Sequence, residues 1–227
     1  GMADYRMYAG KPVVIKPKST NFGLGITILK HNYDETDFKG ALQIAFEHDN
    51  TLLIEKFIPG REFRIFIIND EVVGILHRVP ANVTGDGVLN IGQLIDRKNE
   101  DPLRGKGYRT PLEKIRKGRE EEMFLKQQGM DFNTVPKEGE VVYLRENSNI
   151  STGGDSIDFT DDIDDSYKAI AVEAAKALNV KITGLDMMIQ DIHAPATPDN
   201  YAIIEMNFNP AIHIHCYPFK GKNRHLN

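Results

Sequence analysis

Apolar residues recur in short runs along most of the chain, and these runs predict β-strands. The runs predicted to be strands are residues 11–16, 26–30, 52–57, 62–68, 72–80, 141–146, 184–191 and 201–210. Apolar side chains fall at helical spacing in residues 34–48 and 163–178, residues 113–128 are charged and helix-forming, and a brief helical patch covers 91–97. Much of 80–111 is rich in Gly, Asn and Asp and predicts loop. The pattern thus combines strands with a few helices.

Three oxygen-bearing side chains stand in the last two predicted strands. Asp186 lies in one of these strands, and Glu205 and Asn207 lie in the other. Side chains two apart on a strand leave the same face, so Glu205 and Asn207 point the same way. Acids inside apolar strands are costly to bury without a compensating charge, and Mg²⁺ prefers such oxygen ligands. The sequence therefore predicts a magnesium site here; the alternative is a half-buried hairpin with polar residues on its wet face.

A glycine-rich piece between the first two predicted strands is a candidate phosphate loop. Lys16 ends the first strand, and the loop that follows contains Ser19, Thr20, Asn21, Gly23 and Gly25. Backbone N–H groups and hydroxyls of such a loop can face phosphate oxygens while the lysine adds a point charge. The alternative is a hairpin tip that only makes a turn. Neither a P-loop motif nor a complete G-x-G-x-x-G is present, which disfavours P-loop and Rossmann sites.

The end of the strand at 52–57 and the two strands after it carry further candidates for nucleotide binding. Backbone groups and side chains there are suited to read a base and hold a ribose, and the residues are Glu55, Lys56, Phe57 and Ile58. Antiparallel pairing would bring Arg64 and Arg78 together as a phosphate-directed pair. The alternative is that these arginines are exposed and pair with nearby acids such as Glu62.

A second glycine-rich loop follows the strand at 141–146. Arg145 precedes it, and the backbone amides of Ser151 to Gly154 are candidates to hold an oxyanion or a carboxylate. The alternative is a plain connector. The acidic run at 161–165 is better explained as a cap for the following helix than as a metal site.

Composition narrows the class of protein. The chain has 227 residues, 41% of them hydrophobic, and a net charge of -5, which argues against a non-specific nucleic-acid binder. Cys216 has no internal disulfide partner and no signal peptide or long apolar run is present, so we expect a cytoplasmic protein without membrane association. His213 and His215 lack the further ligands that a zinc site needs. Gly1 before Met2 indicates a tag scar, and the early first strand suggests a fragment of a longer polypeptide.

Taken together, the motifs VVIKPKSTNFGLGI, EKFIPGREFR, HRVPANVTGDG, NISTGGDSID, GLDMMIQD and IIEMNFNPAIHIH resemble those of ATP-grasp carboxylate–amine ligases. Among these, the chain is most similar to the C-terminal glutathione synthetase modules of bifunctional bacterial glutathione-synthesis proteins. The resemblance implies an α+β ATP-grasp fold, with two subdomains of antiparallel sheet flanking a nucleotide cleft. It places a truncated lid subdomain at 1–57 and a subdomain with the metal site at 58–227. The N-terminal substrate domain and one nucleotide-binding lysine of the family are missing, so we expect the chain alone to be weakly active.

The resemblance also implies roles for single residues. Asp186, Glu205 and Asn207 would hold two Mg²⁺ or Mn²⁺ ions. Glu62 would lie near the ribose of ATP. The other residues that would bind ATP are Lys16, Ser19, Thr20, Asn21, Gly23, Gly25, Glu55, Lys56, Phe57, Ile58 and Arg64. Residues facing the phosphates, the acyl phosphate and the substrate would be Arg78, Arg145, Asn149, Ser151, Gly153 and Gly154. His215 lies in a motif on the substrate side.

The reaction implied is amide formation from γ-glutamylcysteine and glycine through an acyl phosphate. The implied partners are small-molecule substrates (a dipeptide or an amino acid) and an upstream glutamate–cysteine ligase domain. The resemblance is also compatible with a homodimer. Alternatives are cyanophycin synthetase-like or D-alanine–D-alanine ligase-like chemistry, or a non-catalytic nucleotide-binding module.

Overall fold

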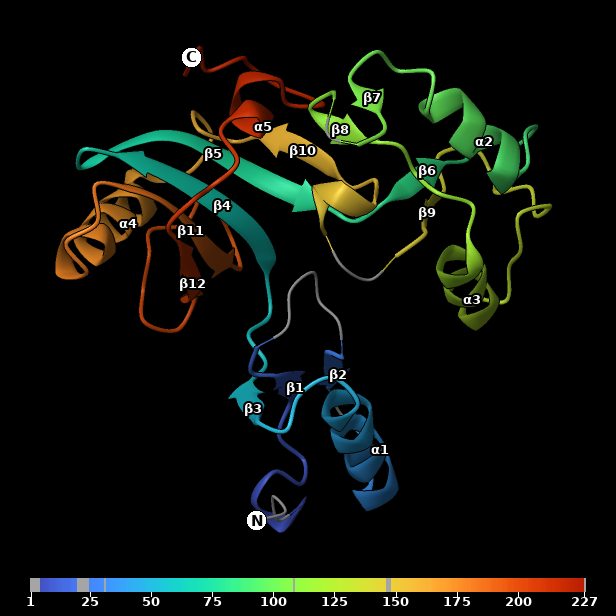
Figure 1. The fold of residues 1–227 in the computed structure, drawn as a ribbon, viewed down its shortest axis with the longest axis horizontal. Coiled ribbons are helices and arrows are strands. Elements are labelled where there is room, and N and C mark those ends of the chain that lie inside the picture. The colour runs from blue at the N-terminus through green and yellow to red at the C-terminus, as the bar shows by residue number, and fades with distance from the viewer. Residues whose placement is uncertain (1–4, 20–24, 31, 108, 146–147, 227) are drawn as a thin grey trace. The chain divides into compact units, whose positions relative to one another are not determined.

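The computed structural model describes residues 5–19, 25–30, 32–107, 109–145 and 148–226 (Figure 1). The chain divides into two compact units, residues 1–59 and residues 60–227, and each is described by itself. Within the described residues, no helix is long and apolar enough to cross a membrane.

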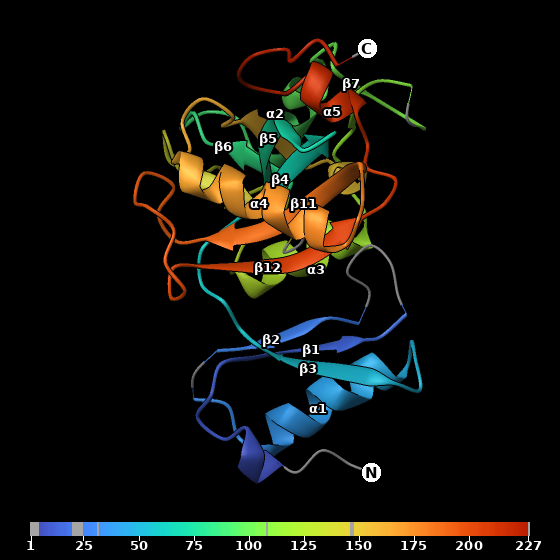
Figure 2. The ribbon, with the colours of Figure 1, turned by 90° about the vertical axis from the view of Figure 1, so that its left-hand side faces the viewer.

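The first unit is a three-stranded antiparallel sheet with a helix packed on it (Figure 2). Its strands β1 (Val13–Pro17), β2 (Thr27–Leu29) and β3 (Leu52–Lys56) are ordered β2-β1-β3, and a short 3-10 helix, η1 (Tyr5–Met7), precedes them. Helix α1 (Glu35–Phe46) begins after Asp34, whose carboxylate accepts hydrogen bonds from the backbone N–H groups of Thr36 and Asp37. The helix thus starts close to where the sequence predicted it.

Alternating burial explains how the first unit holds together. Val13 and Ile15 point toward α1 and are buried, whereas Val14 and Lys16, which lie between and after them, are only partly buried. Phe38 of α1 completes this core and packs against the rings of Tyr8 and Tyr33. Lys16 therefore leaves the sheet on the face opposite the helix.

The second unit is built around a five-stranded antiparallel sheet. Its strands are β4 (Arg61–Ile68), β5 (Glu71–Val79), β10 (Asp155–Asp158), β11 (Ile182–Ile189) and β12 (Tyr201–Asn207), in the order β10-β5-β4-β11-β12. Asn69 and Asp70 form the turn between β4 and β5, and both residues have positive φ, as a tight two-residue hairpin between twisted strands requires.

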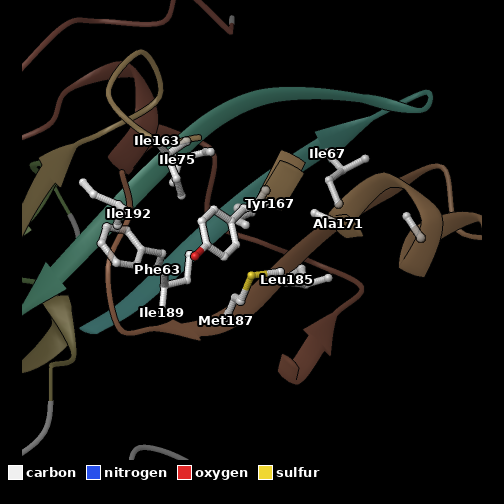
Figure 3. Packing of buried hydrophobic residues seen from close by; sticks show 12 residues of the cluster. Phe63, Ile67, Ile75, Ile163, Tyr167, Ala171, Leu185, Met187, Ile189 and Ile192 are labelled. Carbon is white, nitrogen blue, oxygen red and sulfur yellow. The ribbon is translucent and has the colours of Figure 1, made fainter. Parts of the chain in front are cut away.

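Helix α4 (Asp165–Ala177) covers one face of this sheet and closes the main core (Figure 3). Phe63, Leu185 and Met187 point toward it and pack around the buried ring of Tyr167. The predicted apolar stripe of α4 is wrong at one end, because Leu178 lies beyond the helix and is 58% exposed. Alternate residues of the same strands must therefore point to the opposite face of the sheet.

A smaller layer of short elements continues the second unit and has its own core around Ile91, Leu94 and Leu125. It contains β6 (Asn82–Thr84), α2 (Ile91–Lys98), β7 (Arg104–Gly105), β8 (Leu112–Glu113), α3 (Arg119–Gln127), β9 (Val141–Tyr143) and η2 (Ile150–Thr152). Strand β6 pairs with β9, and β7 pairs with β8.

Two predicted boundaries in this layer are wrong, and so is one at β10 of the five-stranded sheet. The helix predicted over 113–128 starts only at 119, because β8 and the extended Gly118 precede it. The strand predicted over 141–146 ends at Tyr143. The loop predicted over 147–158 ends in β10, whose polar side chains are buried because cations neutralise them: Arg104 and Lys98 pair with Asp155, and Arg224 pairs with Asp158.

The two edges of the five-stranded sheet differ. Strand β10 is covered by the segment after the short helix α5 (His213–Cys216), because Lys220 donates its N–H to the carbonyl of Ser156 and accepts from Asp158. Arg224 holds this segment in place through ion pairs with Asp158 and Asp161. At the other edge, β12 pairs with β11 alone among the described strands.

Candidate functional site

The face of the five-stranded sheet that points away from α4 carries a cluster of charged and polar side chains. In the register of the sheet, Arg64 of β4 lies opposite Asp186 of β11, which in turn lies opposite Glu205 of β12. Opposite residues of antiparallel strands share a face. Asn207 follows Glu205 by two, so it belongs to this face as well. The antiparallel pairing thus places the three predicted metal ligands on one face, as the sequence indicated.

Asp186 is held by two arginines. The Arg64 guanidinium donates from Nε and Nη2 to the two carboxylate oxygens, the second bond measuring 2.8 Å. Nη2 of Arg78 donates to Oδ2 of Asp186 over 3.0 Å and also forms an ion pair with Glu62. Such a bidentate arginine–carboxylate pair fixes the carboxylate plane as well as neutralising its charge. Arg64 is only 8% exposed, and its predicted role as a nucleotide ligand stays a prediction.

These contacts decide the ionisation of Asp186. Burial opposes the charged form, but the hydrogen bonds from Arg64 and the charge of Arg78 outweigh it and lower the pKa of Asp186 below its usual value. An ionised carboxylate offers about four lone-pair sites, and the three arginine N–H groups occupy three of them. Among the described residues, the arginines thus leave one lone pair on Oδ1, and Glu205 lies within hydrogen-bonding reach of Asp186.

Glu205 and Asn207 extend this cluster toward solvent. Glu205 is exposed and accepts a 3.1 Å hydrogen bond from the side-chain amide of Asn207. Two carboxylates and an amide form the oxygen-rich donor set that suits Mg²⁺. In the part of the chain that the structure describes, no group of three or more His, Cys, Asp or Glu side chains is arranged to hold a metal. The donor set consequently fits a divalent cation that takes the rest of its coordination from water or phosphate.

A buried histidine lies beside this cluster. His215 of α5 is 1% exposed, stacks on the ring of Phe66 at 5.2 Å, and finds no hydrogen-bond partner for either ring nitrogen among the described residues. Gly74 makes room for it, since a Cβ there would come within 2.7 Å of the Nδ1 atom. Burial and the nearby charge of Arg64 lower the pKa of His215 to about 3. His215 is therefore neutral at pH 7 and adds no charge next to Arg64.

This histidine should make the stability of the protein depend on pH. The folded-state pKa of about 3 lies below the unfolded value near 6.5. As the pH falls below 6.5 the unfolded chain binds a proton that the folded chain does not, so stability is lost toward acid, by about 1.4 kcal/mol per pH unit. We expect His215→Phe to remove a slope of about that size between pH 4 and pH 6. Urea unfolding of both proteins across this range measures it, and equal slopes would contradict the assignment.

The candidate phosphate and base residues of the first unit have their own contacts. Nζ of Lys16 forms a 2.6 Å ion pair with Glu55, so the residue expected at the phosphates and one expected at the base are partners. The backbone N–H of Ser19 donates to Asp49, and Phe57 packs its ring under the ammonium of Lys30. The predicted ligands Thr20, Asn21 and Gly23 lie outside the described residues. Gly25 has positive φ and lies close to Pro17, which accounts for a glycine there.

The second glycine-rich loop is occupied by its own hydrogen bonds. The backbone N–H groups of Thr152 and Gly154 donate to the carbonyl of Asn149, and that of Gly153 donates to Ile150. These three amides thus already have acceptors within the loop, and the role predicted for the loop stays a prediction. Both glycines have packing reasons instead: Gly153 has positive φ and abuts Ile115, and a Cβ at Gly154 would lie 2.8 Å from the Val79 carbonyl oxygen.

Arg145, which was expected beside this loop, contacts helix α3. Its guanidinium pairs with Glu120 and, at 2.6 Å, with Glu121, which is 1% exposed. The charged face of α3 thus supplies the partners of this arginine. Reading the pair from the sequence would have required knowing that α3 lies against the end of β9.

Two features of the site were not visible in the sequence. Ser148 donates to Glu62 over 3.3 Å, which ties the start of the second loop to the Arg78 ion pair. Gly184 lies under the side chain of Arg64, and a Cβ there would come within 2.9 Å of the arginine Cδ. Its φ is not positive, so space rather than backbone conformation explains this glycine.

Comparison with known proteins agrees with this architecture. The chain is 47% identical to the bifunctional glutathione synthetase from Pasteurella multocida, whose crystal structure aligns with a TM-score of 0.74 over 98% of this chain and 30% of that one. The D-alanine–D-alanine ligase from Bacillus anthracis aligns with a TM-score of 0.51 at 16% identity, covering 92% of this chain and 48% of that one, and shows the fold alone. A family model described as "D-ala D-ala ligase C-terminus" matches residues 2–90. The fold is therefore the ATP-grasp fold expected from the sequence.

Sequence relatives narrow this class. The chain is 63% identical over 225 residues to the glutathione biosynthesis bifunctional protein GshAB of Desulfotalea psychrophila, and 59% identical over 221 residues to that of Clostridium perfringens. These alignments cover 99% and 97% of this chain but 29% and 28% of the relatives. Over the part that it shares with them, the chain is thus similar to glutathione biosynthesis bifunctional proteins. It spans less than a third of their length.

Proposed function

We propose that this chain is a module of an ATP-dependent ligase that makes glutathione. The ligase joins the amino group of glycine to the carboxylate of γ-glutamylcysteine. The observation that carries the proposal is the sheet face on which Arg78, Asp186, Glu205 and Asn207 meet. Cations for phosphate oxygens and oxygen ligands for a divalent ion are combined there. The similarity to bifunctional glutathione biosynthesis proteins supports the choice of substrates.

The chemistry proceeds in two steps. An oxygen of the γ-glutamylcysteine carboxylate attacks the γ-phosphorus of ATP, the bond to the bridging oxygen breaks, and ADP leaves. The glycine nitrogen then attacks the acyl carbon, the carbon–oxygen bond to phosphate breaks, and the amine loses a proton. A carboxylate is a poor electrophile, so this activation is needed before an amine can attack.

Arg78 is the residue of this face best suited to a phosphate. Its Nε–H is buried and has no hydrogen-bond partner among the described residues. An unsatisfied buried donor is costly, and an anionic oxygen would satisfy it with a charge-assisted hydrogen bond. Its Nη2 contacts Glu62 and Asp186, which orients the guanidinium. We assign Arg78 to the triphosphate, together with Lys16 and the loop from Ser19 to Gly25.

The metal ligands proposed are Asp186, Glu205 and Asn207, with Mg²⁺ or Mn²⁺ as the ion. When bound, such an ion offsets the negative charge of the phosphates during transfer. The chain supplies Oδ1 of Asp186, the exposed carboxylate of Glu205, and an Asn207 amide that already holds Glu205. Whether one or two ions are held is a question of stoichiometry that titration answers.

The remaining assignments stay proposals. Glu55, Lys56, Phe57 and Ile58 are proposed to hold the base, and Glu62 the neighbourhood of the ribose. The residues proposed for the acyl phosphate and substrate side are Arg145, Asn149, Ser151, Gly153 and Gly154. We also propose an upstream glutamate–cysteine ligase domain in the parent protein, which would supply γ-glutamylcysteine, and a cytoplasmic location.

The test is product formation by the protein at its natural length. With ATP, Mg²⁺, γ-glutamylcysteine and glycine, we expect one ADP and one phosphate for each glutathione, identified by mass spectrometry. The same assay is run with D-alanine alone and with aspartate and arginine, which represent the D-alanine–D-alanine ligase and cyanophycin synthetase alternatives. Faster amide formation from either alternative than from γ-glutamylcysteine and glycine would overturn the proposed substrates while leaving the ligase chemistry in place.

A further inference from the structure

The buried pair of Arg64 and Asp186 has a geometry that a phosphate ligand would not need. Arg64 turns both Nε and Nη2 to one carboxylate and leaves 10% of its side chain exposed. Arg78, by contrast, contacts two acids through Nη2 and keeps its Nε free among the described residues. The two arginines of this face therefore have different tasks, although the sequence suggested that they act as a pair.

The backbone sets the position of the Arg64 side chain. Arg64 and Asp186 are directly opposite in the β4–β11 register, so both side chains rise from neighbouring points of the sheet. The aliphatic part of Arg64 runs across Gly184, which is also opposite Phe66 and packs against Pro210. A Cβ at Gly184 would lie 2.9 Å from both Arg64 Cδ and the Pro210 Cβ. Gly184 therefore provides the space through which Arg64 reaches Asp186.

Arg64 is buried beside Asp186, which it shares with Arg78. Phe66, two residues along the same strand, carries the stacked ring of His215, and His215 is neutral at pH 7. The charge of Arg64 is thus balanced mainly by Asp186, and a buried cation of this kind is costly to separate from its partner. This coupling fixes the plane of the Asp186 carboxylate.

We propose that Arg64 is a positioning residue for the metal ligand Asp186, and that Gly184 leaves the space that the Arg64 side chain needs to reach it. By occupying one lone pair on each carboxylate oxygen, Arg64 directs the remaining lone pair of Oδ1 toward a cation shared with Glu205. The inference rests on the proposed metal site. It assigns Arg64 to the metal rather than to the nucleotide, and it gives the Gly-Leu-Asp order of β11 a physical reason.

The test compares two changes that disturb the pair from opposite sides. Arg64→Lys keeps the charge but cannot form the bidentate contact. Gly184→Ala keeps the arginine but blocks its path. Loss of an outer-sphere partner of a metal ligand typically lowers metal affinity about 10–100-fold. We expect each change to weaken Mn²⁺ binding by about tenfold or more, with the KM for ATP at saturating metal unchanged within about twofold.

Mn²⁺ binding is measured by electron paramagnetic resonance on the protein at its natural length, without turnover. Binding that survives in the Asp186→Asn, Glu205→Gln double variant belongs to other sites and is subtracted. Arg97→Lys is the matched control, because Arg97 pairs with Asp86 at the surface. If both changes act through the same contact, the Arg64→Lys, Gly184→Ala double variant binds Mn²⁺ about as weakly as either single variant.

Three results would overturn the inference. Unchanged Mn²⁺ affinity together with lower stability would make Arg64 a structural residue only. A raised KM for ATP with normal Mn²⁺ binding would instead indicate that Arg64 binds the nucleotide. If the wild-type protein binds no more Mn²⁺ than the Asp186→Asn, Glu205→Gln variant, the proposed metal site itself is wrong. Neither of the two earlier results would look like this one.

Discussion

Changing Asp186 to Asn together with Glu205 to Gln is expected to slow amide formation by about 10²–10³-fold, the range seen when a preorganised electrostatic contact is removed. The double change removes both carboxylates of the proposed metal site and leaves Asn207 alone. Asp186 additionally loses the charge that balances Arg64 and Arg78. Steady-state turnover with saturating ATP, γ-glutamylcysteine and glycine measures the effect.

The single change of Glu205 separates chemistry from folding. Glu205 is exposed and Asp186 is 2% exposed, so Glu205→Gln should leave the free energy of unfolding nearly unchanged while still slowing turnover. A matched control is Glu71→Gln, an exposed acid at the start of β5 on the same sheet. Normal turnover and normal affinity for Mg-ATP in the double variant would instead favour a non-catalytic nucleotide-binding module.

Replacing Asp155 with asparagine is expected to lower the free energy of unfolding by about 3–5 kcal/mol, as breaking a buried ion pair does. Asp155 is 4% exposed and accepts from Arg104, from Lys98 at 2.7 Å and from Asn82 at 3.0 Å. Arg104 is fully buried, so two cations would lose their counter-charge at once. Urea unfolding at pH 7 measures the loss.

An exposed ion pair provides the comparison for this prediction. Asp96 pairs with Lys117 at 2.6 Å, but its side chain is 62% exposed. Exposed pairs contribute about 0–1 kcal/mol, so Asp96→Asn should change stability little. A loss at Asp155 no larger than that at Asp96 would show that water or a shifted side chain satisfies Lys98 and Arg104.

Short apolar runs were sufficient to predict the strands that have one face in a core. Residues 61–68 and 182–189 alternate between core and polar face, and their predicted ranges agree with β4 and β11 within two residues. Strand β10 was missed because Asp155 and Asp158 are buried as ion pairs rather than as apolar groups. Hydrophobicity reports apolar burial only, so a strand of neutralised acids resembles a loop.

The site was predictable as far as one strand pair determines it. Spacing two apart along β12 placed Glu205 beside Asn207, and the hairpin-like order of the last strands placed Asp186 opposite Glu205. The partner of Arg64 depends on the register between β4 and β11. Arg64 and Asp186 are 122 residues apart in the chain. Local sequence does not encode that register, so the contacts of Arg64 with Asp186 and of Arg145 with Glu121 could not be predicted.

The unequal borders of the five-stranded sheet determine where it can grow. Lys220 already forms backbone hydrogen bonds with Ser156 and Asp158 of β10, and the ion pairs of Arg224 hold that segment against the strand. At β12, Ile203 and Ile204 are exposed and no further described strand is paired. An unsealed border is a template for strand addition. Among the described strands, β12 is therefore the edge of this sheet at which another strand could pair.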